Sequence, residues 1–115
     1  MAALAAFDLD IAEHDDVLEL AVAGDLDCAS APRLRQVMTE ATRDYRVVIV
    51  DLSSTEFADC AGIGVVAAAH EEQRARGRDL VLRSPSSAVR RLMELTGLSQ
   101  EIATTGPATR SGQAP

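Results

Sequence analysis

Apolar residues occupy every second position in two stretches near the N-terminus. One stretch runs from Phe7 to Ile11 and the other from Leu18 to Val22. A period of two is typical of β-strands that keep one face in solvent. The polar run 13–16 between them can turn the chain, so residues 6–23 are predicted to form an antiparallel hairpin.

Three later stretches place apolar residues three and four positions apart, which is the spacing of one helix face. The first begins near Pro32, a residue suited to a first helical turn, and Asp27 or Ser30 can cap it. The second covers about residues 61–76 and stops at Gly77, because glycine readily adopts the left-handed conformation that ends helices.

The third helix is predicted to have Ser84 as its N-cap and Pro85 in its first turn, and to end at Gly97. A strand at about 46–52 precedes the second helix. Its continuous apolar run, Val47–Val50, predicts a strand that is buried on both faces.

The chain ends with a short strand at 79–83, the third helix and a brief edge strand within 98–103. The order of elements predicts a single α/β domain over residues 1–103. It would hold a mixed sheet of four or five strands, with an N-terminal antiparallel hairpin followed by βαβα units, and about three main helices. From Thr104 onward the small and polar composition predicts a disordered tail, residues 104–115.

Composition and charge exclude several classes of function. The net charge of −7 argues against a nucleic-acid binder, which needs a basic face for phosphate contacts. Every basic residue is arginine, and without lysine the chain cannot use the phosphate-binding lysine loop, Schiff-base catalysis or protein-kinase chemistry. The opening residues 1–6 lack the basic start and the long apolar run of an export signal, so none is expected, and no stretch approaches the ~20 apolar residues of a membrane span. A cytoplasmic protein with two reduced cysteines is therefore expected, without direct membrane insertion.

The chain contains residue types that can act in catalysis, but the sequence around them does not supply the partner residues that catalysis needs. The paired carboxylates at 15–16 and 71–72 lie in polar segments, and His70 is predicted to pack rather than to act as a base. Cys60 is the one reactive candidate, because a thiol at a helix N-terminus can ionise more readily, although the adjacent Asp59 opposes the thiolate. Structural packing, redox sensing and covalent catalysis are the alternatives for this thiol. We expect no catalytic residue, no cofactor and no metal, and a domain that binds another protein.

Three segments together resemble the STAS domain, the family shared by anti-sigma factor antagonists and the cytoplasmic tails of sulphate transporters. They are Gly24–Asp27, Val48–Ser53 and Phe57–Gly64, and the resemblance covers about residues 7–103. The family's last motif usually reads Asp-Ser-Ser-Gly-Leu-Gly. An ATP-dependent anti-sigma kinase binds there and phosphorylates the serine after the aspartate, which releases the kinase.

This sequence departs from the family motif at the phosphorylated position. Cys60 and Ala61 replace the two serines, whereas Asp59, Gly62 and Gly64 are retained. Neither replacement can accept phosphate from a serine kinase. The resemblance therefore implies partner binding without phosphorylation at this position.

The resemblance implies a non-catalytic regulatory module that binds an anti-sigma factor of the ATPase/kinase type. Its partner-binding residues are predicted to be Asp25, Asp27, Ser30, Ser53, Ser54, Glu56, Asp59, Cys60, Ala61, Gly62 and Ile63. Gly62 is the preferred contact and Gly64 the preferred packing residue.

Several alternatives stay open. The domain could be a permanently active antagonist, a scaffold in a signalling complex, or an antagonist switched at Ser53, Ser54 or Thr55. It could also be a STAS subunit that docks on the ATPase of a membrane transporter, or a small-ligand sensor. A homodimer is equally open.

Overall fold

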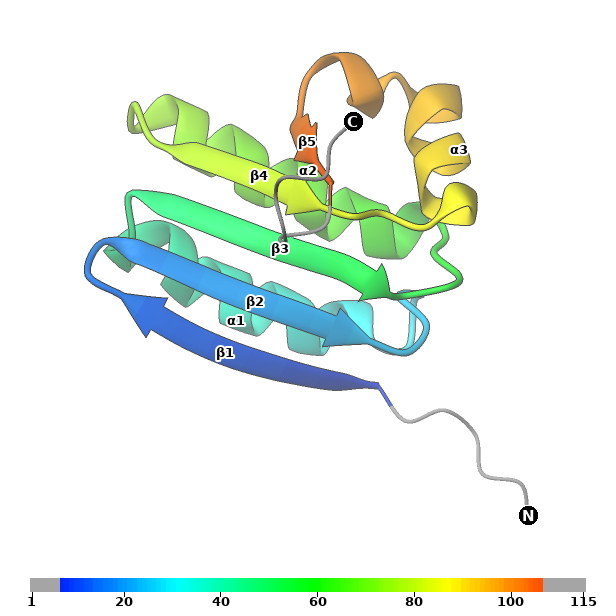
Figure 1. Cartoon of the computed structure of the whole chain (residues 1–115), viewed down its shortest axis with the longest axis horizontal. Helices are drawn as coiled ribbons and strands as arrows, with labels where there is room; N and C mark the ends of the chain where they lie inside the picture. The colour runs from blue at the N-terminus through cyan, green and yellow to red at the C-terminus, as the bar shows by residue number, and fades with distance from the viewer. Residues whose placement is uncertain (1–6, 107–115) are drawn as a thin grey trace.

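Five strands form one sheet in the order in which they occur along the chain, and helices connect the strands from β2 onward (Figure 1). The computed structural model describes residues 7–106. Its elements are β1 (Asp8–His14), β2 (Val17–Ala23), α1 (Ala31–Asp44), β3 (Val47–Ser54), α2 (Cys60–Ala75), β4 (Asp79–Arg83), α3 (Ser87–Thr96), the short 3-10 helix η1 (Leu98–Gln100) and β5 (Ala103–Thr105).

The sheet is mixed, as the sequence predicts. β1 and β2 are antiparallel, and β2, β3, β4 and β5 run parallel to one another. The hairpin turns at Asp15, whose positive φ of 55° suits a tight two-residue connection. Parallel strands end at the same edge of the sheet, so the loops that follow β2 and β3 lie at one end of the molecule.

The prediction that the central strand is buried on both faces is wrong. Val48, Val50 and Leu52 are fully buried, whereas Val47 and Ile49 on the other face are only partly buried. Figure 1 shows the reason, because α1 and α2 lie side by side on the same face of the sheet. On the opposite face, none of the helices within residues 7–106 covers β3, and its side chains there stay partly exposed.

Charged side chains cross this open face of the sheet. Arg83 on β4 places its Nη1 atom 3.1 Å from Glu19 Oε1 on β2 and 3.8 Å from Asp51 Oδ2 on β3. His14 on β1 lies 3.1 Å from the other oxygen of Glu19. The network therefore joins four neighbouring strands through their side chains.

The start of the third helix also differs from the prediction. Ser86, not Ser84, caps α3, because the Ser86 hydroxyl oxygen accepts from the Val89 amide at 3.3 Å. Ser84 instead has a positive φ of 51°, and its amide donates to the Thr105 carbonyl. Ser84 thus belongs to the end of the β4–β5 pair, and α3 begins at Ser87, directly after its cap.

The last strand is displaced from its predicted position. Residues 98–100 form η1, and β5 pairs with β4 over residues 103–105. Two residues assigned to the tail, Thr104 and Thr105, are therefore strand residues. The rest of the predicted tail, residues 107–115, lies outside the described part. Within residues 7–106, no helix is both long enough and apolar enough to cross a membrane.

Candidate partner-binding corner

Two sequence motifs about thirty residues apart lie against each other at the carboxyl end of the sheet. Leu26, after β2, forms an isolated parallel bridge with Ala58, after β3. The Leu26 amide donates to the Phe57 carbonyl at 2.9 Å, and the Asp59 amide donates to the Leu26 carbonyl at 3.0 Å. We call the exposed surface around this bridge the corner; its side chains are those of Asp25, Ser53, Ser54, Glu56, Phe57, Cys60 and Ala61.

Asp59 sets the start of α2. Its backbone is extended, its carboxylate accepts from the Gly62 amide at 2.9 Å, and its carbonyl accepts from the Ile63 amide. This is a standard N-cap, which satisfies a main-chain donor that the helix leaves unpaired. Asp59 therefore holds the corner in shape and is only partly exposed.

The roles predicted for the two glycines are reversed. Gly62 is buried, and a Cβ atom there would collide with the main chain and side chain of Leu26. Gly64 is exposed, and a Cβ atom there would meet nothing within 4 Å. Gly62 is thus the packing residue, and Gly64 is the one that leaves open space.

Three other predicted contact residues make their contacts within the domain itself. Ser30 is 6% exposed, and its hydroxyl donates to the Asp25 carbonyl at 2.8 Å. The Asp27 carboxylate accepts from the amides of Ala29 and Ser30, so it stabilises the turn into α1. Ile63 is 3% exposed and belongs to the hydrophobic core. Burial removes Ser30 and Ile63 from any accessible surface.

One of the alternative switch residues is also inaccessible. Thr55 is fully buried, and its hydroxyl donates to the Val22 carbonyl at 2.9 Å. Ser53 and Ser54 just before it are exposed. Of the three alternative switch residues, only these two serines are therefore accessible to a modifying enzyme.

Phe57 is a corner residue that the sequence prediction omitted. Its side chain is 50% exposed, although the chain has only two phenylalanines and one tyrosine. Large aromatic side chains that stay exposed in a small domain are frequent anchors in protein interfaces. The position of Phe57 between the polar loop and the helix cap is the feature of the sequence that could have indicated its place in the corner.

The corner is acidic, with the exposed carboxylates of Asp25 and Glu56 beside the partly exposed Asp59. Cys60 is a free thiol, exposed at the first position of α2.

Tyr45 lies outside the corner. Its pKa is raised because its hydroxyl forms a hydrogen bond with Glu13 and because acidic side chains lie near it.

A different group of side chains could hold a metal ion. Ligand atoms of His70, Glu71 and Glu101 lie within 4.8 Å of one another. His70 is buried, as its predicted packing role requires, and Glu71 also pairs with Arg74 at 3.6 Å. This group lies in the second half of α2 and in the segment before β5, apart from the corner.

Comparison with known proteins decides the family. Residues 8–111 match the model of the STAS domain. The chain belongs to the STAS domain family. The resemblance deduced from the three motifs is confirmed, and so is the fold that it implied.

Several of the similar proteins are anti-sigma factor antagonists. The anti-sigma-B factor antagonist of Listeria monocytogenes is 33% identical over 96 residues, which cover 82% of this chain and 84% of the antagonist. The crystal structure of an anti-sigma factor antagonist from Mycobacterium paratuberculosis has a TM-score of 0.79 at 27% identity, covering 87% of this STAS domain and 86% of that chain. These relatives support a regulatory module.

The same fold also occurs in transport proteins. A sulfate transporter family protein from Wolinella succinogenes has a TM-score of 0.69 at 18% identity, covering 78% of this chain and 76% of that chain. At this identity the match shows a common fold alone.

Proposed function

We propose that this STAS domain is a non-catalytic anti-sigma factor antagonist that binds an ATPase-type anti-sigma factor through the corner. One observation carries the proposal: the start of α2 is exposed at Cys60 and Ala61 while Asp59 and Gly62 hold it rigidly beneath. A rigid surface that carries an exposed aromatic side chain loses little conformational entropy when a partner binds. Its exposed carboxylates suit a partner that presents basic groups.

Cys60 determines how such an antagonist is regulated. In the family's usual motif a serine at this position receives a phosphate, which adds about 1.5 to 2 negative charges at neutral pH. Placed beside Asp59, that charge would repel the carboxylate and would have to be desolvated in an interface, so the complex would dissociate. Cys60 offers no hydroxyl to a serine kinase. We infer that binding at the corner persists in the presence of ATP.

The experiment is a binding assay with a purified anti-sigma factor of the ATPase type, with and without ATP. The wild-type domain is expected to stay bound and to take up no phosphate. Cys60→Ser is the matched variant, because it adds only the missing hydroxyl, and it is expected to accept phosphate and then to dissociate. Mass spectrometry that finds phosphate on Ser53 or Ser54 of the wild-type protein after incubation would contradict persistent binding.

A second candidate function follows from the fold shared with a sulfate transporter protein. In that case the corner would dock on the ATPase of a membrane transporter. The same assay separates the two candidates, because a transporter ATPase and an anti-sigma factor can compete for one labelled domain. Retention of the anti-sigma factor in the presence of excess transporter ATPase supports the first candidate.

A further inference from the structure

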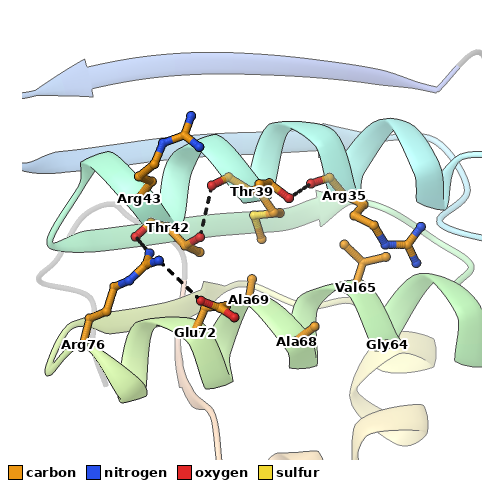
Figure 2. Close-up of a pocket in the computed structure, with 11 residues that line it drawn as sticks. Arg35, Thr39, Thr42, Arg43, Gly64, Val65, Ala68, Ala69, Glu72 and Arg76 are labelled. Atoms are coloured by element: carbon orange, nitrogen blue, oxygen red, sulfur yellow. Dashed lines mark hydrogen bonds and ion pairs between the residues drawn. The ribbon is translucent and has the colours of Figure 1, made fainter.

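A groove runs between α1 and α2 on the side that faces away from the sheet (Figure 2). Its volume is about 360 Å³, and small-molecule sites usually hold about 300–1,000 Å³. Apolar groups from both helices line it, among them Met38, Val65, Ala68 and Ala69.

Small residues on α2 keep the groove open. Gly64 and Ala68 are one turn apart on the exposed side of the helix, and nothing lies within 4 Å of where a Gly64 side chain would begin. Glycine inside a helix lowers its stability relative to alanine, and packing among residues 7–106 gives no reason for a glycine at this position. The space is therefore a feature of the helix surface that the fold itself does not use.

The groove is basic although the chain is acidic. Three arginines and a single carboxylate line it, in a chain whose net charge is −7. At one end the positive charge of Arg76 is already paired, because Arg76 lies 3.6 Å from Glu72 and donates to the Thr42 carbonyl at 2.7 Å. Arg43 lies 3.9 Å from its neighbour Asp44.

Arg35 differs from the other two arginines. No ion pair within residues 7–106 involves it. Figure 2 shows Arg35 reaching from α1 toward α2 beside Val65, at the end of the groove where Gly64 lies. A guanidinium in this position can bind a carboxylate through two parallel hydrogen bonds.

We propose that this groove binds a small aliphatic carboxylate. The carboxylate pairs with Arg35, and the hydrocarbon chain lies over Met38, Val65 and Ala68. At the far end Arg76 pairs with Glu72 and donates to the Thr42 carbonyl across the groove, and this contact limits the length of the ligand (Figure 2). Eight helical residues separate Gly64 from Glu72, which is roughly 12 Å and the scale of a medium-chain fatty acid. The groove volume of about 360 Å³ is smaller than one turn of a partner helix, which is about 10 Å across and about 5.4 Å long.

The test uses decanoate as the probe and the isotope-labelled full chain in NMR titrations. We expect decanoate to shift the amide resonances of Arg35, Val65 and Ala68, and uncharged decanol to bind at least about tenfold more weakly, since it lacks the ionic contact. Arg35→Gln is expected to lose a similar factor. Arg90→Gln, at an exposed position of α3, is the matched control for charge and should bind as the wild type does.

A second variant tests the groove itself. Ala68→Phe fills the space from an exposed helix position and should abolish decanoate binding while the far-ultraviolet circular dichroism spectrum stays unchanged. If that variant does not fold, Gly64→Val provides the same obstruction one turn earlier. The proposal is overturned if decanol binds as tightly as decanoate or if Arg35→Gln retains wild-type affinity. Binding of an acidic helical peptide in the groove without any binding of decanoate would overturn it as well.

Discussion

Gly62 packs so closely against Leu26 that no side chain fits between them. A Cβ atom on Gly62 would lie 2.7 Å from Leu26 Cγ and closer still to the Leu26 carbonyl oxygen. That carbonyl cannot move away freely, because it accepts a hydrogen bond from the Asp59 amide. The loop after β2 and the first turn of α2 are therefore fixed to each other through main-chain contacts, and the shape of the corner depends on this one small residue.

The two glycines of the corner motif should respond in opposite ways to alanine. Gly62→Ala is expected to lower the free energy of unfolding by about 1–3 kcal/mol, because the added methyl group is overpacked against Leu26. Gly64→Ala should raise it by about 0.5–1 kcal/mol, because alanine is the better helix former and the position is open. Urea denaturation of both variants measures the difference, and each serves as the control for the other. Equal effects of the same sign would show that the close contact at Leu26 does not govern stability.

Gln73 is the polar residue on which the end of the sheet opposite the corner depends. It is fully buried, and its Nε2 atom donates to the carbonyls of Tyr45, Arg46 and Asp79 at 2.9–3.3 Å. Gln73→Met preserves the approximate volume but removes the donor. We expect the free energy of unfolding to fall by about 1–3 kcal/mol, because three carbonyls lose the donor that the buried Gln73 side chain supplies. Gln100→Met, at an exposed position, is the control and should change the urea midpoint little.

The sequence predicted the order of elements well and the burial of polar residues poorly. Gln73 stands in the run Glu71–Arg74, whose composition indicates a solvated helix end. Carbonyl groups meet its buried side chain from the loop before β3, about 27 residues away in the sequence, and from the first residue of β4. Pattern analysis registers only that a residue is polar. It does not register which main-chain groups the fold will bring within reach.

The corner shows the same limit for glycine and serine. The motifs identified the correct segments, because Gly24–Asp27 and Phe57–Gly64 do meet in space. The motifs do not show which of Gly62 and Gly64 contacts Leu26, since the sequence shows only that both positions are glycine. Ser30 was expected on the surface for a similar reason, but its hydroxyl bonds to the turn that precedes α1. Only the position of each atom in the assembled fold separates a structural residue from a contact residue.

Arg83 should stabilise the open face of the sheet in a salt-dependent manner. It lies between the carboxylates of Glu19 and Asp51, and only 19% of its side chain is exposed. Arg83→Gln leaves the two carboxylates without a cation, and a loss of about 1 kcal/mol in the free energy of unfolding is expected at low ionic strength. The loss should shrink in about 1 M sodium chloride, where charges are screened over about 3 Å. A loss that is unchanged by salt would mean that packing of the arginine stem, not its charge, provides the stabilisation.

Phe57 should contribute to partner binding without contributing much to stability. Half of its side chain is exposed at the corner, so Phe57→Ala should change the free energy of unfolding by less than about 0.5 kcal/mol. If the corner binds an anti-sigma factor, the same change should weaken the complex by about tenfold or more, which corresponds to about 1.4 kcal/mol. Leu95→Ala is the matched control, because Leu95 on α3 is 78% exposed and equally apolar but lies outside the corner. Calorimetric titration of the two variants with the anti-sigma factor measures both affinities. A loss of affinity in the Leu95 variant that equals the loss in the Phe57 variant would place the interface on α3.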